Sequence, residues 1–404
     1  MTKNTSLKAV EEGINIGKAS VARDKLTRAQ DEMSDKFVER EAEIKGLFIA
    51  WLAGVHALLL GPPGTAKSLL ARTFSDVVAG GSFFQWLLTK FSSPEELFGP
   101  VSFSGLKSDK FERVTTGKLP EAEVAFLDEI FKANSSILNA LLTALNEGLF
   151  FNGTGTTKIP LQLCVGASNE LPEDASLDAL YDRFLLRFWV NPIADRDALS
   201  SLLTGGMSCP TVRISAAEAQ ELRYLVDAVP FEKADAKLLL DVKAAVEAEG
   251  FKPTDRTWVH CVQILKAAAV VEGRDKIIPA DYRILADVLW REAKDRAKLA
   301  QVIGNSSDPY GSRAQAIADA AKSLLRELPD LSVLDNGQKT KWEVIDEAGK
   351  VSQKLTALKE KLDQVILEAG YGNPSLDDAL DRVEKAIDVA DGIASKAVDH
   401  KEAK

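Results

Sequence analysis

The chain has 404 residues and a mass of 43.8 kDa, which at about 150 residues per domain predicts two to three domains. Its composition, 46% hydrophobic and 27% charged residues, is typical of globular proteins and excludes a chain that is disordered throughout. The 50 basic and 60 acidic residues give a net charge of −10, so no overall positive field is present to hold nucleic acid, and we expect no nucleic-acid partner.

The three cysteines and three histidines are scattered and show no zinc-ligand spacing, so we expect neither a disulfide framework nor a zinc site. The first thirteen residues lack the apolar segment of a signal peptide. The apolar stretch at residues 46–61 is shorter than the roughly 20 residues of a membrane span. We therefore expect a cytoplasmic protein with no membrane span, in which residues 46–61 form a buried helix end followed by a buried strand.

Four segments follow one another along the chain. Residues 1–35 are charged and favour a helix, which we expect to be an extension on the surface or facing a partner. Residues 36–204 alternate helical patterns with short apolar runs, which predicts an α/β domain with a mostly parallel sheet buried on both faces. The runs lie at residues 55–60, 83–88, 124–128, 161–167 and 185–190.

Two helical segments follow the α/β domain. Residues 205–303 carry no comparable strand runs and predict a smaller all-α domain. Residues 304–404 contain apolar side chains at alternating steps of four and three, from Val344 to Val365 and again from Leu376 to Ala394. Such a coiled-coil-like seam must be buried against another helix. A hairpin or bundle within the chain is the favoured interpretation, and a partner helix is the alternative.

A glycine-rich loop lies between a predicted strand and a predicted helix. This order aims backbone N–H groups and the positive end of the helix dipole at a phosphate, and Lys67 would reach the outer phosphates while the Ser68 hydroxyl coordinates Mg²⁺. Ala66 stands where the general pattern has glycine; we expect it to open the helix in a right-handed conformation and the loop to survive. The predicted nucleotide-binding residues are Gly61, Pro62, Pro63, Gly64, Thr65, Ala66, Lys67, Ser68 and Leu69.

Two carboxylates, Asp128 and Glu129, end the apolar run at 124–128. At the carboxyl edge of a parallel sheet, beside a phosphate loop, Asp128 can hold Mg²⁺ and Glu129 can orient and deprotonate the attacking water. Two solvated acids at a strand end are the alternative, but their position after a phosphate loop favours hydrolysis of ATP or GTP.

These motifs, together with ASNELP at 167–172 and LYDRFLLR at 180–187, resemble the MoxR branch of AAA+ ATPases over roughly residues 36–300. SPEELFGPVSFSGLK, LPEAEVAFLDEIFKA, LLTALNEGLFFNG and PTDRTW look most like the RavA subgroup. The resemblance implies a P-loop AAA+ core with an all-α lid, and ATP and Mg²⁺ as ligands.

Three residue roles follow from the resemblance alone. Asn169 is similar to sensor 1, which positions the lytic water. Arg183 resembles the arginine finger that reaches a neighbouring subunit's γ-phosphate, with Arg187 as the fallback. Arg256 looks like sensor 2, which reads the nucleotide in the same subunit. The alternatives are a cap of the turn before Pro172 for Asn169, and a pair with Asp182 or another surface acid for Arg183.

The resemblance also implies an output. We expect a ring, in the form of a hexamer, that spends ATP hydrolysis on chaperone-like remodelling or activation of a protein client, with a von Willebrand factor A (VWA) domain protein as adaptor. Residues 93–120 and 148–163 are expected to project from the ring. Their aromatic residues Phe103, Phe111, Phe150 and Phe151 are either client contacts or anchors for the hairpin, and anchors are the favoured interpretation. The alternatives are a MoxR-like activase dedicated to a single metalloenzyme or to Rubisco, and a nucleotide-binding assembly scaffold. A DNA-directed motor is disfavoured by the acidic pI of about 5.1 and by the lack of a basic stretch interleaved with aromatic residues.

Overall fold

The computed structural model describes residues 16–78, 82–153, 155–172, 174, 177–204, 209–331, 334, 339–369 and 373–399. These residues divide into two compact units. Unit 1 takes in the described residues up to Lys237 and the segment Phe251–Leu299, and unit 2 takes in Leu238–Gly250 and the described residues from Ala300 onward. Unit 1 contains the sheets, and unit 2 is helical.

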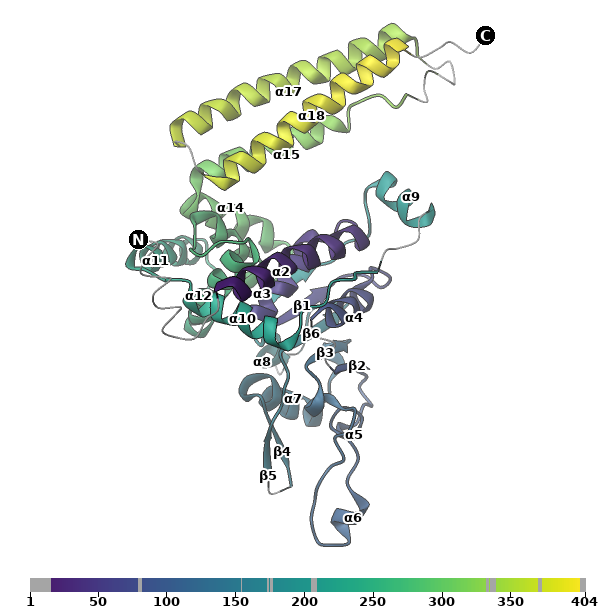
Figure 1. Cartoon of the computed structure of the whole chain (residues 1–404), viewed down its shortest axis with the longest axis vertical. Coiled ribbons are helices and arrows are strands. Elements are labelled where there is room, and N and C mark those ends of the chain that lie inside the picture. The colour runs from purple at the N-terminus through teal and green to yellow at the C-terminus, as the bar shows by residue number, and fades with distance from the viewer. Residues whose placement is uncertain are drawn as a thin grey trace. The chain divides into compact units, whose positions relative to one another are not determined.

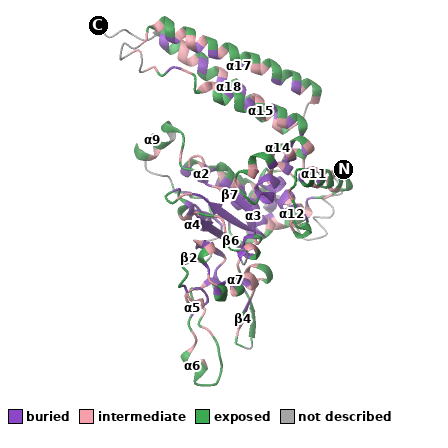
Figure 2. Ribbon diagram, turned by 180° about the vertical axis from the view of Figure 1, so that it is seen from behind, coloured by how far each residue is buried: buried purple, intermediate pink, exposed green. Residues whose placement is uncertain are grey.

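Five parallel strands form the main sheet in the described part of unit 1, in the order β2-β3-β6-β1-β7. They fall on the five apolar runs predicted from the sequence. Strands β1, β3, β6 and β7 are buried along nearly their whole length, because a strand covered on both faces needs an uninterrupted series of apolar side chains, and Figure 2 shows β6 and β7 largely in the colour of buried residues. The edge strand β2 is buried only at Phe84, so the expected burial on both faces is wrong for this strand. The predicted α/β class is confirmed. The strands are β1 His56–Leu60, β2 Phe83–Leu87, β3 Val124–Asp128, β6 Leu163–Ser168 and β7 Phe184–Trp189.

The three central strands bring three loops together. β3, β6 and β1 are neighbours and run in the same direction, with Leu127 paired to Gly166 and Leu60 paired to Ser168. The carboxyl ends of parallel neighbours meet at one edge of a sheet, where ligands of such folds bind. The loops that follow these strands therefore begin at the same edge of the sheet. Figure 1 labels the three strands next to one another.

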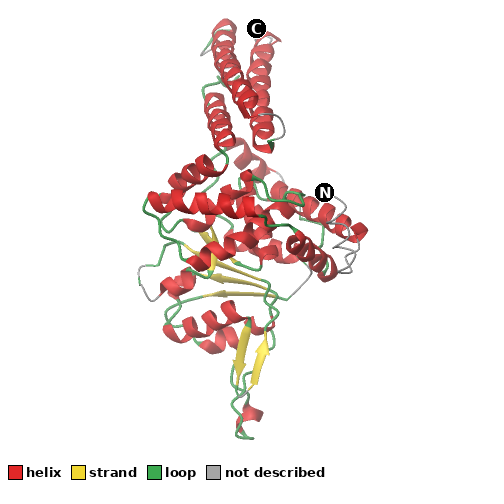
Figure 3. Ribbon diagram, turned by 90° about the vertical axis from the view of Figure 1, so that its left-hand side faces the viewer, coloured by secondary structure: helices red, strands yellow, loops and turns green. Residues whose placement is uncertain are grey.

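Helices lie on both sides of the sheet (Figure 3). Helix α3 is buried from Gly46 to Leu52 and is followed by the fully buried β1, so the expected helix end and strand at residues 46–61 are confirmed. The helices of this part are α3 Glu41–Ala53, α4 Lys67–Val77, α5 Pro94–Phe98, α6 Phe103–Leu106, α7 Ser135–Glu147, α8 Asp178–Tyr181 and α9 Arg196–Thr204, with short 3₁₀ turns at η1 Leu119–Glu121 and η2 Ile130–Lys132.

Helix α2, Ile16–Lys36, is packed into unit 1, which corrects the expectation of a surface extension. Leu26 and Met33 are fully buried on its inner side. Lys25 forms a 2.8 Å ion pair with Glu218 of α10, and the Glu32 carboxylate accepts hydrogen bonds from the backbone N–H groups of Thr211 and Val212. The helix therefore ties the segment after α9 to the body of the unit.

The chain beyond α9 is helical in its described part, as predicted. Helix α10 begins with a capping box, in which the Ser215 hydroxyl and the Glu218 carboxylate each bond the other's backbone N–H. At the start of α12 the Thr254 hydroxyl accepts a hydrogen bond from the backbone N–H of Thr257. The helices are α10 Ala216–Ala228, α11 Lys233–Ala248, α12 Asp255–Val271 and α13 Ala286–Leu289, with the 3₁₀ segment η4 Pro279–Leu285.

A hairpin and a long loop project together from unit 1 (Figure 3). The antiparallel strands β4 Leu149–Asn152 and β5 Gly155–Lys158 form the hairpin. Asn152 accepts a hydrogen bond from the backbone N–H of Arg113 and donates one to its carbonyl. The Asn152 side chain therefore joins the loop that carries α5 and α6 to the hairpin.

Unit 2 buries the predicted seam within the chain. Helices α15 Pro309–Leu325, α17 Lys341–Ala369 and α18 Pro374–Asp399 pack against one another, and α14 Asp295–Ser307 precedes them. Leu355, Leu362 and Val383 are almost completely buried in this core. The favoured intrachain arrangement is therefore confirmed in the form of a three-helix bundle, in which α15 packs against both α17 and α18.

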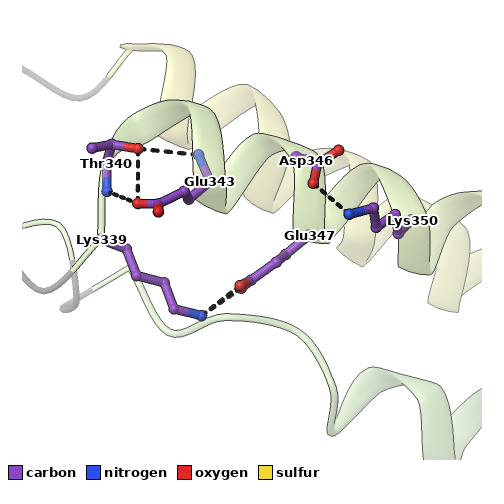
Figure 4. A network of polar contacts seen from close by, with 6 residues as sticks. All are labelled: Lys339, Thr340, Glu343, Asp346, Glu347 and Lys350. Carbon is purple, nitrogen blue, oxygen red and sulfur yellow. Dashed lines mark hydrogen bonds and ion pairs between the residues drawn. The ribbon is translucent and has the colours of Figure 1, made fainter.

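The start of α17 is fixed by local polar contacts (Figure 4). The Glu343 carboxylate accepts hydrogen bonds from the N–H and the hydroxyl of Thr340, and the Thr340 hydroxyl accepts one from the N–H of Glu343. The same contacts lower the pKa of Glu343. Ion pairs Lys339–Glu347 and Lys350–Asp346 lie along the next turns. This is a threonine–glutamate capping box, which satisfies N–H groups that a helix start otherwise leaves open.

Among the described residues, no helix combines the length and the apolar character that are needed to cross a bilayer.

Candidate active site

The glycine-rich loop follows β1 and needs its glycines. Gly61 has φ 141°, and a Cβ at this position would lie 2.3 Å from the carbonyl oxygen of Val190. Gly64 also has a positive φ, of 82°. Both positions lie in backbone regions that side chains disfavour. The predicted strand, loop and helix are therefore all present in order.

Lys67 opens α4 and folds back over the loop that precedes it. Its Nζ donates to the carbonyl oxygens of Gly61 at 2.7 Å and Pro62 at 2.8 Å. Burial lowers the pKa of Lys67, while the charges of Asp128 and Glu129 oppose that shift. The ammonium group therefore lies at the loop, within the field of the two carboxylates.

Ala66 corrects one expectation. It adopts φ 65° and ψ 20° as the N-cap of α4, a left-handed conformation and not the right-handed one expected. The loop must turn sharply before Lys67 can start the helix, and this turn requires a positive φ that glycine adopts without strain. An alanine there costs about 1 kcal/mol. The loop nevertheless forms.

Asp128 and Glu129 lie at the carboxyl end of β3. Burial raises the pKa of Asp128, against a hydrogen bond of 3.0 Å from the N–H of Glu129 to its Oδ1. Glu129 has φ 51° and ψ 45° and begins the 3₁₀ turn η2. Left-handed backbone at a residue other than glycine is rare and is typical of sites that hold strain for function.

Asn169 follows β6 and reaches Glu129. Its Nδ2 donates to Oε1 of Glu129 at 2.8 Å. The structure therefore brings together four of the predicted residues, Lys67, Asp128, Glu129 and Asn169, at the edge where β1, β3 and β6 end.

Lys132 is a member of this group that the sequence analysis missed. Its Nζ lies 3.2 Å from Oε2 of Glu129. The only signal for it was its spacing of three residues from Glu129, which places two side chains together in a 3₁₀ turn.

Arg183 and Arg256 lie in a second cluster. Burial lowers the pKa of Arg183, and the positive charge of Arg256 lowers it further. The pKa of His260 is also lowered, mainly by burial and then by the charges of Arg256 and Arg183. The Nε of Arg183 is buried and has no hydrogen-bond partner among the residues that the structure describes. Arg256 donates to Asn146 Oδ1 of α7 at 3.3 Å. These three side chains therefore lie near enough for the arginine charges to act on one another and on His260, and two neighbouring guanidinium groups suit an anion.

Arg187, the fallback for Arg183, is part of the core. It is 5% exposed, and its guanidinium donates to the carbonyl oxygens of Phe184, Val288 and Trp290. The same group lies 4.2 Å from the ring centroid of Tyr181. Arg187 therefore joins β7 to the α13 segment and does not extend toward a neighbouring molecule.

The donors near Lys67 suit Mg²⁺ bound together with a nucleotide. Ser68 supplies a hydroxyl and Asp128 a carboxylate, the oxygen ligands that Mg²⁺ prefers. A cation beside Asp128 would favour the ionised form that burial disfavours. Mg²⁺ usually keeps several water ligands and binds phosphate oxygens of its substrate, which would complete the coordination.

The four aromatic residues of the projecting elements divide into two kinds. Phe150 is buried and stacks on Phe98 with ring centroids 5.5 Å apart, so it anchors the hairpin. Phe103, Phe111 and Phe151 are 77%, 57% and 59% exposed. The anchor interpretation therefore holds for one of the four.

Two family models match the chain. One, described as the MoxR domain in MoxR–vWA–β-propeller ternary systems, matches residues 24–227, and the other, an AAA lid domain, matches residues 236–303. An uncharacterized protein of Methanocaldococcus jannaschii is 34% identical over 364 residues, which cover 89% of this chain and 96% of the relative.

Two further proteins are similar. The chaperone MoxR1 of Mycobacterium tuberculosis is 26% identical over 286 residues, which cover 65% of this chain and 74% of MoxR1. A crystal structure of a protein from Cytophaga hutchinsonii has a TM-score of 0.60 at 21% identity and covers 74% of this chain and 97% of its own. This second likeness shows a shared fold.

Proposed function

The chain belongs to the MoxR family of AAA+ ATPases, and from that premise we propose that it couples Mg²⁺-dependent ATP hydrolysis in a ring to the remodelling of a protein client. The observation that carries the proposal is the contact between Asn169 and Glu129 beside Lys67. A carboxylate held by an amide, next to a loop that suits phosphates, is equipped to orient a water for attack.

Each residue of the first cluster has a role in this proposal. The N–H groups of the loop and Lys67 hold the phosphates, and the Lys67 ammonium leaves its own carbonyl partners to do so. Ser68 and Asp128 would hold Mg²⁺, which when bound neutralises charge on the phosphates. Glu129 orients the water and accepts its proton, while Asn169 fixes the direction of the carboxylate.

Arg183 of the second cluster serves a neighbouring subunit. Arg183 and Arg256 lie together, whereas the charges that act on Lys67 are those of Asp128 and Glu129. We assign Arg183 to the terminal phosphate of a nucleotide held by the next subunit. For Arg256 we keep the expected role at the nucleotide of its own subunit, and a second contact to the neighbour's phosphate beside Arg183 is the alternative. Positive charge placed on the transferring group lowers the barrier, so hydrolysis would require assembly, for which a hexameric ring is proposed.

Two observations support a protein client: the exposed aromatic residues of the projecting hairpin and loop, and the descriptions of the family model and of MoxR1. The exposed Phe103, Phe111 and Phe151 offer apolar contacts to a client. The family model is described by systems that pair MoxR with a vWA protein, and MoxR1 is called a chaperone. A VWA-domain adaptor and a chaperone-like activity are proposed for this chain on that basis, as is the RavA-like character of its motifs.

The test is the ATPase rate per subunit as a function of protein concentration, with Glu129→Gln as the blank. We expect a rate that rises with concentration and is lost in the variant, because each site needs a neighbour. A rate equal to the blank while ATP still binds would contradict the proposal and favour the assembly scaffold.

A further inference from the structure

Lys132 and Asn169 contact the Glu129 carboxylate from two sides. Asn169 Nδ2 lies 2.8 Å from Oε1, and Lys132 Nζ lies 3.2 Å from Oε2. Both oxygens of the residue that is to orient the water are therefore engaged by protein groups, one neutral and one positively charged.

The backbone creates the contact with Lys132. Glu129 is left-handed, and the next three residues form the turn η2, closed by a hydrogen bond of 2.8 Å from the N–H of Lys132 to the carbonyl of Glu129. Side chains three residues apart lie above one another in such a turn. An extended continuation of β3 would have carried Lys132 away from the site, so the strained conformation of Glu129 and the ion pair occur together.

The exposure of the pair indicates that it contributes little to folding. The side chain of Lys132 is 53% exposed and that of Glu129 is 17% exposed. Ion pairs with a solvated lysine hardly stabilise a fold, because water competes for the ammonium and the long side chain loses freedom. The contact can therefore break and re-form without disturbing the sheet, as a reversible restraint must.

We propose that Lys132 is a positioning residue that restrains Glu129: its ammonium holds Oε2 away from the attacking water, and turnover requires its release. The proposal rests on the role assigned to Glu129 in the proposed function. Asn169 holds Oε1 whether or not Lys132 is in contact, so release of the ammonium frees one oxygen of an already oriented carboxylate.

The test compares kcat and KM for ATP in Lys132→Met, Lys132→Gln and Lys132→Arg. The first two keep a long side chain without charge, and we expect kcat to rise about three- to fivefold with KM changed less than about twofold. Lys132→Arg restores a cation that reaches Oε2, so its kcat should return to the wild-type value. Lys361→Met removes one positive charge from an exposed position of α17 and is the matched control, with no change expected.

Three results would overturn the restraint. An unchanged or lowered kcat in both neutral variants would mean that the ion pair does not limit turnover. A raised KM would mean that Lys132 contacts the nucleotide. A gain in the neutral variants that Lys132→Arg retains would mean that charge is not the cause.

The proposed function has its own readout in the same assays. It fails if Glu129→Gln hydrolyses ATP as fast as the wild type, whatever Lys132 does. If Glu129→Gln is inactive, the double variant Lys132→Met/Glu129→Gln must be equally inactive, since a restraint without its carboxylate has nothing to act on; activity in that double variant would overturn the inference alone.

Discussion

The Nδ2 of Asn169 lies 2.8 Å from Oε1 of Glu129, although 40 residues separate them in the sequence. The two side chains come from the ends of β6 and β3, which are neighbours in the sheet. The Asn169 amide fixes one carboxylate oxygen of Glu129, and the left-handed backbone of Glu129 fixes the start of the same side chain. Both ends of the Glu129 side chain are therefore restrained.

Asn169→Ala removes that hydrogen bond, and we predict a loss of about 10- to 100-fold in kcat for ATP hydrolysis, the scale of a lost preorganised contact. KM should change little, because the phosphates are held by the loop and Lys67. Steady-state kinetics at saturating Mg²⁺ measures both quantities. Ser168→Ala is the neighbouring control: its hydroxyl bonds the Glu170 carbonyl, so kcat should be nearly retained. A raised KM with unchanged kcat in Asn169→Ala would place Asn169 on the nucleotide.

Replacing Ala66 by glycine should stabilise the protein. At φ 65° the methyl group of alanine is strained, and glycine has no such strain. Glycine also raises the entropy of the unfolded chain, but by less than the relieved strain. We therefore expect the free energy of unfolding to rise by about 0.5 kcal/mol. Urea unfolding followed by tryptophan fluorescence is the measurement. Ala71→Gly, at a buried position inside α4, should instead lower stability by about 1 kcal/mol or more. A lower midpoint for Ala66→Gly would show that the alanine methyl group contributes packing.

Features that leave a local sequence pattern could be predicted, and features that depend on the packing of distant segments could not. The strands and the loop were predictable because burial on both faces and a phosphate-binding turn each leave a local pattern, as in VAFLD before Glu129. The left-handed Ala66, the burial of α2 and the meeting of Arg183 with Arg256 depend on how distant segments pack, which no local pattern encodes. Lys132 is an intermediate case. Its spacing of three residues from Glu129 can be read from the sequence, but the 3₁₀ turn that brings the two side chains together cannot.

Mixed rings test whether Arg183 acts across subunits. Arg183→Ala and Glu129→Gln should each be inactive, because each lacks a different part of the shared site. In an equimolar mixture about one site in four combines an intact Glu129 with an intact neighbouring arginine, so we expect about a quarter of the wild-type rate. The rate of the mixture, with mixed assembly verified by differently tagged subunits, is the measurement.

Arg256→Ala in the same mixture distinguishes its two possible roles. If Arg256 joins Arg183 on the neighbour's phosphate, Arg256→Ala should complement Glu129→Gln to the same extent. No recovery for Arg256 alongside recovery for Arg183 is expected if Arg256 acts at the nucleotide of its own subunit, as proposed, and no recovery for either in verified mixed rings would contradict the shared site.

His56 is a buried histidine that joins β1, β6 and α7. Its Nδ1 accepts a hydrogen bond from the N–H of Cys164 on β6, and its Nε2 contacts the Leu145 carbonyl of α7, both at 3.2 Å. Only the neutral ring protonated at Nε2 makes both bonds. Burial lowers the pKa of His56 from 6.5 to about 4, against the opposing effect of the Leu145 carbonyl.

The sign of the pH dependence follows from this lowered pKa. Between pH 6.5 and about 4 the unfolded chain binds a proton at His56 that the folded chain does not, so the free energy of unfolding falls as the pH falls through this window. The full loss is on the order of 3 kcal/mol. His56→Gln can still donate to the Leu145 carbonyl but does not titrate, so its urea midpoint should decline less between pH 7 and pH 5 than that of the wild type. His260→Gln, at a half-buried position in the arginine cluster, is the control and should keep most of the wild-type decline in urea midpoint. If the midpoints of the wild type and His56→Gln decline equally between pH 7 and pH 5, groups other than His56 set the acid sensitivity of unit 1.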